Sequence, residues 1–303
     1  MRTEIPAPAL TAGIVTAAFG RHFEVRVANG VVLCHTRGKR NDYACGDEVG
    51  IIPTGSGQGV IETLHPRQNL LWRSDAFRQK RLAANLNLIV IVTATEPTFS
   101  ELLISRCLAA AESEHIPAII VLNKIDLTAD LPQALEKLNI FATLGYPVIE
   151  ISARSGAAEL KPWLENAKAV LVGQSGMGKS TLINALIPEA AATVGKISAS
   201  LNSGTHTTTL TRLYPHGNGW LIDSPGLQAF GLAHIDPSAL DAAFIEFRPW
   251  LGQCRFRNCR HSDEPGCALR AEAQAGTLSG IRLEHYRIIR DEIVAARQAA
   301  GWA

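Results

Sequence analysis

The sequence has no excess of charge of either sign and no apolar run long enough to cross a membrane. Lys and Arg together number 29 and Asp and Glu 28 among 303 residues, so the formal net charge is +1. This balance excludes an acidic-tail protein and a uniformly basic nucleic-acid coat protein. The longest aliphatic run beside a candidate strand covers residues 88–92, whereas a membrane-spanning helix needs roughly 18 apolar residues. We therefore expect no membrane contact.

The first ten residues also lack the features of a secretory signal. They contain a single Arg and no apolar core segment, and we expect a soluble, cytoplasmic protein. Hydrophobic residues make up 47% and charged residues 19% of the chain, a composition typical of folded globular proteins and not of disordered ones. The length predicts two or three domains.

Short strand-like segments fill the first seventy residues. Residues 22–27 alternate apolar and polar side chains, and Asn29-Gly30 separates them from the apolar residues 31–34. Asn-Gly favours a two-residue hairpin because both turn positions need positive φ. Three further runs occupy residues 13–19, 49–52 and 60–64. Such a series of short strands favours a small OB-fold barrel, with a generic all-β domain as the alternative.

Between residues 82 and 235, apolar strands alternate with helical segments. We expect strands at residues 88–92, 118–122, 148–151, 169–172, 210–214 and 220–222, and helices that include residues 99–114 and 179–187. This alternation predicts a mainly parallel sheet covered by helices. Strand patterns stop after residue 236, where helices are expected at residues 237–247 and 279–298.

A phosphate-binding loop occupies residues 173–180, which match G-x-x-x-x-G-K-[ST] between an expected strand and an expected helix. Its glycines let backbone N–H groups converge on phosphate oxygens at the positive end of the helix. Lys179 is expected to contact the β- and γ-phosphates, and the Ser180 hydroxyl to bind Mg²⁺. The expected phosphate-binding residues are Gly173, Gln174, Ser175, Gly176, Met177, Gly178, Lys179, Ser180 and Thr181.

Residues 123–126 form an N-K-x-D tetrad directly after an expected strand, and this tetrad indicates guanine. The carboxylate of Asp126 would accept hydrogen bonds from the ring N1–H and the exocyclic amine, and adenine has neither donor there. The Lys124 stem would lie along the ring. A Ser-Ala pair follows the next strand and would present a backbone N–H to the guanine O6. The expected guanine-binding residues are Asn123, Lys124, Ile125, Asp126, Ser152 and Ala153.

A D-x-x-G motif at residues 223–226 completes the nucleotide elements. Asp223 is expected near Mg²⁺ through water, and the Gly226 N–H near the γ-phosphate. A threonine before this motif must complete the Mg²⁺ shell and sense the γ-phosphate. Thr207 and Thr208 are both candidates, and the sequence does not choose between them.

These motifs stand in a rotated order. Ordinary P-loop GTPases run from the P-loop through the switch threonine and D-x-x-G to N-K-x-D and Ser-Ala, whereas here the last two come first. We therefore predict a circularly permuted G domain. The chain after Gly226 leads directly into the C-terminal segment, and we expect a rearrangement on loss of the γ-phosphate to pull on that segment.

Three of the six cysteines cluster near the C-terminus. Three thiolates and one imidazole with no open position favour a structural, tetrahedral Zn²⁺ over reduced structural cysteines. The surrounding segment is small, so the metal should contribute to its folding. The expected ligands are Cys254, Cys259, His261 and Cys267. Basic and aromatic residues interleave with them, which suits RNA contacts or, alternatively, a solvated face; they are Arg248, Trp250, Arg255, Phe256, Arg257 and Arg260.

The barrel, the permuted motifs and the C-x4-C-x-H-x5-C cluster together resemble the RsgA (YjeQ/YloQ) family of GTPases over nearly the whole chain. Further matching residues are Gly46-Asp47-Glu48-Val49, Pro66-Arg67, Leu71, Arg73, Ala84-Asn85, His206-Thr207-Thr208, Phe230-Gly231-Leu232, Arg282-Leu283 and Tyr286. Ser203-Gly204-Thr205 and Asn87 depart from the family pattern. The resemblance implies a late assembly factor of the small ribosomal subunit, whose GTP hydrolysis that subunit stimulates.

The residue after D-x-x-G bears on hydrolysis. Leu227 stands where many GTPases have a Gln that orients the attacking water, so we expect slow intrinsic turnover. His206 is the preferred candidate to position water and Gln228 the second; the alternative is that His206 only belongs to a polar loop. The expected catalytic residues are His206, Thr207 and Thr208.

We therefore expect an α/β chain with an OB-fold barrel at residues 1–72, a circularly permuted P-loop GTPase domain at 73–235 and a helical zinc-binding domain at 236–303. The expected ligands are GTP or GDP, Mg²⁺ with the nucleotide, and one structural Zn²⁺. The expected partners are the small ribosomal subunit and its rRNA, and we expect the protein to be a monomer. The alternatives are an RNA-binding module that senses GTP and a permuted GTPase of the large subunit.

Overall fold

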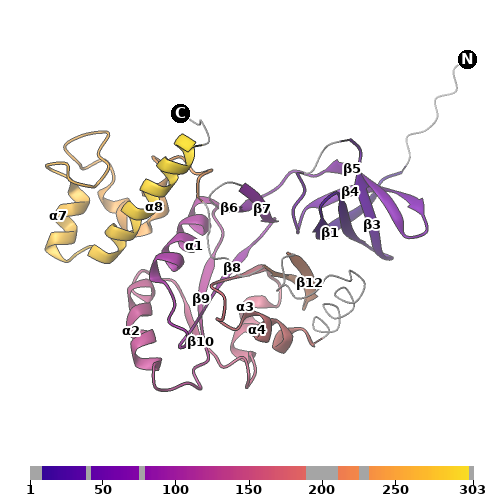
Figure 1. Cartoon of the computed structure of the whole chain (residues 1–303), viewed down its shortest axis with the longest axis horizontal. Coiled ribbons are helices and arrows are strands. Elements are labelled where there is room, and N and C mark those ends of the chain that lie inside the picture. The colour runs from indigo at the N-terminus through magenta and orange to yellow at the C-terminus, as the bar shows by residue number, and fades with distance from the viewer. Residues whose placement is uncertain (1–8, 39–41, 75–78, 189–210, 225–231, 300–303) are drawn as a thin grey trace, which may run out of the picture.

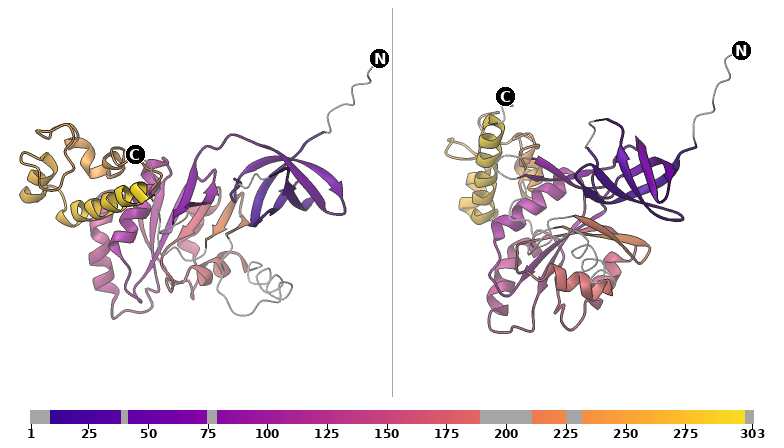
Figure 2. Two further views of the ribbon diagram at one scale, coloured as in Figure 1. Left: turned by 45° about the horizontal axis from the view of Figure 1, so that its top comes forward. Right: turned by 45° about the vertical axis from the view of Figure 1, so that its right-hand side comes forward.

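The computed structural model describes residues 9–38, 42–74, 79–188, 211–224 and 232–299. Figures 1 and 2 show a barrel and a helical C-terminal segment on opposite sides of a central sheet that helices cover. Within the described residues, no helix has both the length and the apolarity that a membrane span requires.

The N-terminal part is a closed, five-stranded, OB-like barrel, as the alternating pattern predicted. Its strands are β1 (Thr11–Phe19), β2 (His22–Val27), β3 (Gly30–Thr36), β4 (Glu48–Gly55) and β5 (Gln58–Leu64). They pair in the order β1-β2-β3-β5-β4, and a β1–β4 pairing closes the barrel. Only the β3–β5 pair among these is parallel. The inward side chains of Val15, Phe23, Val25 and Ile51 are fully buried and form the barrel core.

The central sheet is mainly parallel, which confirms the pattern of alternating strands and helices. Its order is β10 (Val148–Glu150), β9 (Ala118–Asn123), β8 (Leu88–Ala94), β11 (Lys168–Val172), β13 (Gly219–Asp223) and β12 (Arg212–His216), and only β12 is antiparallel to its neighbour β13. Every residue of β8 is buried because helices cover both faces. Figure 1 shows α1 (Glu101–Ser113) and α2 (Leu131–Ala142) on one side, and α3 (Lys161–Leu164) and α4 (Lys179–Leu186) on the other.

A hairpin of β6 (Leu70–Ser74) and β7 (Gln79–Ala84), which the sequence pattern did not predict, joins the barrel to the sheet. Gly46 approaches Ala84 so closely that a Cβ there would lie 2.3 Å from the Ala84 carbonyl oxygen. The fully buried Asp47 accepts two 2.7 Å hydrogen bonds from Arg67. These contacts give a structural role to Gly46, Asp47 and Arg67, which are among the family-like residues. The expected domain limit at 72/73 falls inside β6 and, like the limit at 235/236, stays a prediction.

The C-terminal segment contains α6 (Leu240–Ala243), a 3₁₀ helix η2 (Ile245–Trp250), α7 (Ala268–Ala275) and α8 (Gly280–Ala299). The last helix confirms the prediction for residues 279–298. The single helix predicted at 237–247 is wrong, because Phe244 is extended (ψ 97°) and divides it into α6 and η2. The extended backbone lets the buried Phe244 ring stack on Phe247 and meet Tyr286 edge-on, at centroid distances of 5.1 and 5.4 Å.

Candidate nucleotide-binding site and metal centre

Four of the predicted nucleotide motifs lie at one edge of the central sheet. The P-loop follows β11, N-K-x-D follows β9, Ser-Ala follows β10, and Asp223 ends β13. These strands are parallel, so their carboxyl ends meet at a single edge, where open α/β sheets bind ligands. Loops that are 54 and 74 positions apart in the chain are thereby brought into hydrogen-bonding contact.

The P-loop needs glycine at its close contacts. Gly173 has φ 148°, and a Cβ there would lie 2.2 Å from the Val92 carbonyl oxygen. Gly178 has φ 88°, and a Cβ would lie 2.3 Å from the side-chain nitrogen of Asn123. Gly178 is also the N-cap of α4, with no side-chain cap. The first N–H groups of α4 are therefore not covered by a capping side chain, which suits an anionic ligand.

The Lys179 side chain is held inside the P-loop by two hydrogen bonds. It is only 7% exposed, and its Nζ donates hydrogen bonds of 2.7 Å to the carbonyl oxygens of Gly173 and Gln174. Burial lowers the pKa of Lys179, while the charge of Asp223 opposes that shift. Burial also raises the pKa of Asp223 to about 6, and Lys179 limits the rise. The Lys179 ammonium and the Asp223 carboxylate are thus electrostatically coupled.

Asn123 connects three loops of the site. Its side-chain nitrogen donates to the Met177 carbonyl of the P-loop at 2.9 Å, and its side-chain oxygen accepts from the Ala153 N–H at 2.9 Å. Lys124, which has φ 63°, donates from Nζ to the carbonyl oxygens of Glu96 and Gly176 at 2.7 and 2.8 Å. The N-K-x-D tetrad therefore orders the P-loop as well as the expected base pocket.

Asp126 is exposed and available to a base. The Ser152 hydroxyl donates to its Oδ1 at 2.6 Å, and this hydrogen bond lowers the pKa of the carboxyl. The ionised carboxylate is an acceptor only, as recognition of guanine N–H donors requires. The sequence predicted only that the backbone of the Ser152 loop lies near the base. No feature of the sequence predicted the hydrogen bond between the Ser152 side chain and Asp126.

The other predicted nucleotide residues fall into two groups. Ser175, Ser180 and Thr181 are exposed at the P-loop and the start of α4, whereas Met177 is buried and Ile125 is half-buried against the core. Gln174 has a contact that the motif did not predict, since its Oε1 accepts from the Ser100 N–H at 2.8 Å. The predicted residues His206, Thr207, Thr208 and Gly226, with Leu227 and Gln228, lie outside the described residues.

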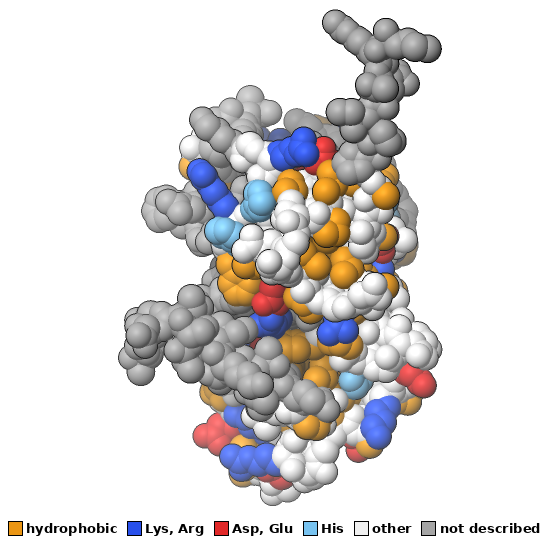
Figure 3. Space-filling model, turned by 90° about the vertical axis from the view of Figure 1, so that its right-hand side faces the viewer, with side chains coloured by type: hydrophobic (Ala, Val, Ile, Leu, Met, Phe, Trp, Pro, Cys, Tyr) orange, Lys and Arg blue, Asp and Glu red, His pale blue; other side chains and the backbone are white. Residues whose placement is uncertain are grey.

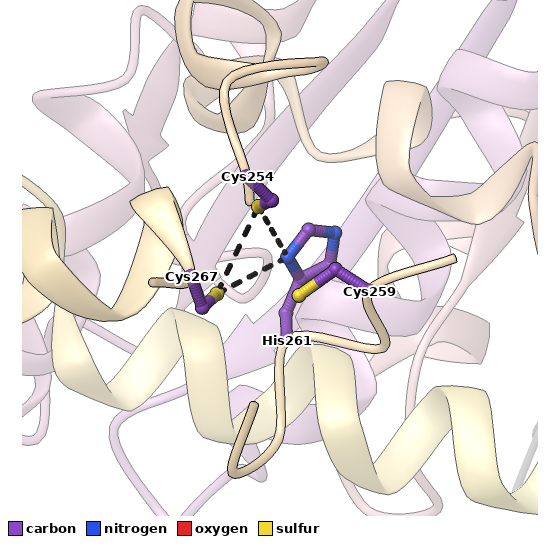
Figure 4. Close-up of side chains that lie close together, drawn as sticks. All are labelled: Cys254, Cys259, His261 and Cys267. Carbon is purple, nitrogen blue, oxygen red and sulfur yellow. Dashed lines mark hydrogen bonds between the residues drawn. The ribbon is translucent and has the colours of Figure 1, made fainter. Parts of the chain in front are cut away.

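The predicted metal ligands converge on one point (Figure 4). The ligand atoms of Cys254, Cys259, His261 and Cys267 all lie within 4.8 Å of one another. The Nδ1 of His261 is 3.6 Å from the Cys254 sulfur and 3.4 Å from the Cys267 sulfur. Among the described residues this is the only such group that could hold a metal ion. Three sulfurs and one nitrogen fit a closed, tetrahedral zinc site.

A second layer holds the imidazole in place. The Nε2 of His261 is 3.5 Å from the Asp241 carboxylate, whose other oxygen accepts from the Tyr286 hydroxyl at 2.5 Å. A carboxylate on the second ring nitrogen selects the tautomer that presents Nδ1 to a metal. Asp241 precedes the ligand cluster, and no spacing in the sequence connects it with His261. The remaining cysteines, Cys34, Cys45 and Cys107, are buried elsewhere as free thiols.

The chain is similar to known proteins over most of its length. A family model described as RsgA GTPase matches residues 64–233. The small ribosomal subunit biogenesis GTPase RsgA of Nitrosospira multiformis is 50% identical over 287 residues, which cover 94% of this chain and 91% of that protein. The crystal structure of YjeQ from Thermotoga maritima has a TM-score of 0.72 at 30% identity and covers 94% of this chain and 99% of that one.

The structure of YloQ, described as a circularly permuted GTPase, has a TM-score of 0.69 at 24% identity, with 95% of this chain and 96% of that chain covered, and it shows the shared fold. The family model spans more than half of the sequence, and the permuted motif order agrees with this fold. The chain therefore belongs to the RsgA family of circularly permuted GTPases and hydrolyses GTP.

Proposed function

We propose that this chain is a late-stage assembly factor of the small ribosomal subunit, and that the subunit stimulates its hydrolysis of GTP. The observation that carries the proposal is the 50% identity over 94% of the chain to a protein named a small ribosomal subunit biogenesis GTPase. The meeting of the described nucleotide motifs at one sheet edge independently supports the nucleotide-binding part of the proposal. Under this proposal the protein acts in the cytoplasm, as a monomer.

For the phosphates, we assign residues 173–181 to binding, with Lys179 as the cation on the β- and γ-phosphates. The buried ammonium and the glycine-lined approach support this assignment. Ser180 and Asp223 would hold Mg²⁺, and either Thr207 or Thr208 would complete its shell. When bound, Mg²⁺ neutralises charge that develops on the transferred phosphoryl group.

For the base, we assign Asp126 to the guanine N1–H and exocyclic amine. Its exposed carboxylate and the Ser152 hydrogen bond support this role. The Ala153 N–H would meet the guanine O6, and Asn123 holds that residue in place. Adenine has no N–H donor at either of these positions, so the carboxylate would be left unpaired and ATP should bind poorly.

For hydrolysis, we propose that His206 positions the attacking water once the subunit orders its loop. Leu227 supports this indirectly, because an apolar side chain cannot orient water. If His206→Ala loses subunit-stimulated turnover while GDP affinity stays unchanged, the assignment holds. Full stimulated turnover in that variant would exclude it, and the same assay on Gln228→Ala tests the second candidate.

For the metal centre, we propose one structural Zn²⁺ held by Cys254, Cys259, His261 and Cys267. The donor set, the separations of at most 4.8 Å and the carboxylate behind His261 support this. When bound, zinc would cross-link a segment in which α6 and α7 have only four and eight residues. All four positions are taken by the protein, so a catalytic role is not proposed.

The metal-binding loop is a candidate for contact with rRNA. Arg255, Phe256, Arg257 and Arg260 are all exposed on the metal-binding loop, and the Arg255 guanidinium lies 5.4 Å from the centre of the Phe256 ring. Such pairs suit contacts with phosphates and bases. Arg248 is also exposed, and its guanidinium donates to Glu112 of α1 at 2.6 Å. On the barrel, Figure 3 shows apolar side chains gathered on the exposed face, and Val31 of β3 is 51% exposed.

The test is the rate of GTP hydrolysis by the full chain alone, with purified small subunits and with purified large subunits. We expect stimulation by small subunits only. Stimulation by large subunits alone would overturn the proposal in favour of a large-subunit factor. GTP binding without turnover in any condition would favour an RNA-binding module that senses GTP.

A further inference from the structure

The barrel holds the first residues of β12, directly after a segment that is expected to act in hydrolysis. His206, Thr207 and Thr208 belong to that segment, which lies outside the described residues, and the described chain resumes at Thr211. Arg212 then pairs with Ala17 of β1, which is the register that joins the barrel to the central sheet. The position of β12 therefore depends on contacts with a different part of the protein.

Two barrel side chains reinforce this contact. Glu24 of β2 forms an ion pair with Arg212, in which the two side chains are only 21% and 14% exposed. The Cys45 thiol donates to the Thr211 carbonyl oxygen at 3.3 Å and lies 3.6 Å from that of Thr16. Burial raises the pKa of Cys45 to about 12, so its thiol stays protonated and keeps its donor. A partly desolvated ion pair constrains geometry more strongly than an exposed one.

Arg212 also lies beside Asp223, the carboxylate that we assigned to Mg²⁺. In the antiparallel β12–β13 pair, Arg212 is directly opposite Asp223. Directly opposed residues project on the same face of a sheet. The guanidinium is held by Glu24 on the barrel side, so a loss of Glu24 would release a cation next to Asp223 and loosen the end of β12.

We propose that Glu24 is a positioning residue for GTP hydrolysis, which acts through Arg212 on the end of β12 and on its neighbour Asp223. The barrel then contributes to the chemistry without touching the nucleotide. A partner that binds the barrel could act on turnover through this ion pair. The proposal rests on the GTPase activity of the family, and its regulatory part rests on the proposed stimulation by the small subunit.

The barrel offers a matched control. Arg37 and Glu62 form a second ion pair at 3.0 Å, whose side chains are 70% and 32% exposed. Both belong to the barrel, and neither is recorded in contact with β12 or β13 among the described residues. Glu62→Gln therefore removes the same charge from the same domain without affecting the anchored strand.

The experiment compares Glu24→Gln, Arg212→Met, the double variant, Arg212→Lys and Glu62→Gln in the full chain. We expect Glu24→Gln to lower kcat about tenfold, or about 1.4 kcal/mol, with KM for GTP changed less than about twofold. Arg212→Met should do the same, and the double variant should be no slower than either single one, because both changes break one contact. Arg212→Lys should retain more activity than Arg212→Met, and Glu62→Gln should match the wild type.

A purely structural role would give a different result. It would raise KM for GTP with kcat unchanged, and this would overturn the proposal. Multiplicative losses in the double variant, or a kcat of Glu24→Gln within about twofold of wild type, would do so as well. If Glu24→Gln does not fold, the proposal is tested by the ratio of the kcat of Arg212→Lys to the kcat of Arg212→Met. A ratio of about one would overturn it. The proposed function is tested separately, by the rate of GTP hydrolysis of the wild type with and without small subunits.

Discussion

At the scale of single residues, the side chain of Asn123 supports both the expected base pocket and the P-loop. Asn123 bonds to Met177 on one side and to Ala153 on the other, so a change at one loop is transmitted to the next. Asp126 differs from these, because it is exposed and its only recorded side-chain partner among the described residues is Ser152. Its substitution should alter base recognition without altering the fold.

Asp126→Asn should therefore change the nucleotide that the protein prefers. We expect GTP affinity to fall about 100-fold, because the amide cannot accept from both guanine donors, and affinity for xanthosine triphosphate to rise. Fluorescent nucleotide titration measures both. Asp130→Asn removes an exposed carboxylate from the same loop region and should leave both affinities unchanged. Equal loss of affinity for guanine and xanthine nucleotides would contradict the assignment.

We expect the half-buried His285 to make the stability of the protein depend on pH. Its Nδ1 lies 2.9 Å from the Ser105 hydroxyl of α1, and burial, together with Arg282 of its own helix, lowers its pKa to about 4. Glu246 faces the same cluster through Arg282. Because the folded pKa lies below the ordinary value of His, the unfolded chain binds more protons at mildly acidic pH. The stabilisation is complete above the unfolded pKa and is lost as pH falls toward the folded one.

His285→Gln should accordingly flatten the pH dependence. Gln can keep the hydrogen bond to Ser105 but does not titrate. We expect the wild type to lose more unfolding free energy than the variant between about pH 7.5 and about pH 5.5, measured by urea denaturation. Protonation of the zinc ligands affects both proteins and cancels in the difference. Parallel pH profiles of the two proteins would refute this role.

At the scale of elements, α1 is the contact point between the G domain and the C-terminal segment. Its N-cap Ser100 donates its backbone N–H to Gln174 of the P-loop. Farther along, Ser105 accepts from Arg282 of α8 at 2.7 Å. Near its C-terminus, Glu112 accepts from Arg248 of η2. One helix thus touches the phosphate-binding loop at one end and the C-terminal segment along its length.

Arg282→Met tests this interface. The guanidinium is 1% exposed, donates to Glu246 at 2.6 Å and lies 4.4 Å from the centre of the Phe244 ring. Removing one partner of a buried pair leaves the other charge uncompensated, and we expect a loss of about 3 kcal/mol of unfolding free energy. Glu292→Gln breaks the more exposed pair with Arg106 in the same interface, and it should cost less than about 1 kcal/mol. If chemical denaturation shows equal losses of unfolding free energy in the two variants, burial does not determine how much an ion pair contributes to stability.

The sequence predicted elements well where periodicity is local. The strands of the barrel and of the parallel sheet follow apolar patterns that a single segment contains. The helix at residues 237–247 failed because Phe244 leaves the helical conformation to stack on Phe247 and Tyr286. The contact with Tyr286 joins residues 42 positions apart in the chain, and local propensity carries no information about it.

At the scale of the whole molecule, the C-terminal segment contacts both the proposed metal ligands and the G domain. His261 connects to Asp241 and thence to Tyr286 of α8. Arg287 of the same helix donates to the His261 and Ser262 carbonyl oxygens at 2.9 Å. Loss of the metal should therefore disturb α8 and its contact with α1, while the nucleotide edge of the sheet remains intact.

Cys259→Ser measures that dependence. We expect the variant to lose its bound zinc and its C-terminal segment to become sensitive to protease, because metal binding contributes to folding in small domains. GDP affinity should stay within about twofold of wild type. Elemental analysis, limited proteolysis and nucleotide titration give the three readouts. Cys34→Ala, in the barrel, should keep its zinc; a protease-resistant Cys259→Ser without metal would show that the segment folds by packing alone.

The sequence by itself determined the nucleotide motifs, their permuted order and the spacing of the four candidate metal ligands. Each depends on a short run of backbone with fixed spacing, so Gly178 or Cys254 can be assigned without knowing what lies opposite. The tertiary structure decided the contacts that support them, which are Asp241 behind His261, Arg282 against Ser105, and Glu24 on Arg212. These pairs are separated by 20, 177 and 188 positions. Side chains so far apart meet only because the sheet and the barrel close, and a single sequence has no local pattern that records such a meeting.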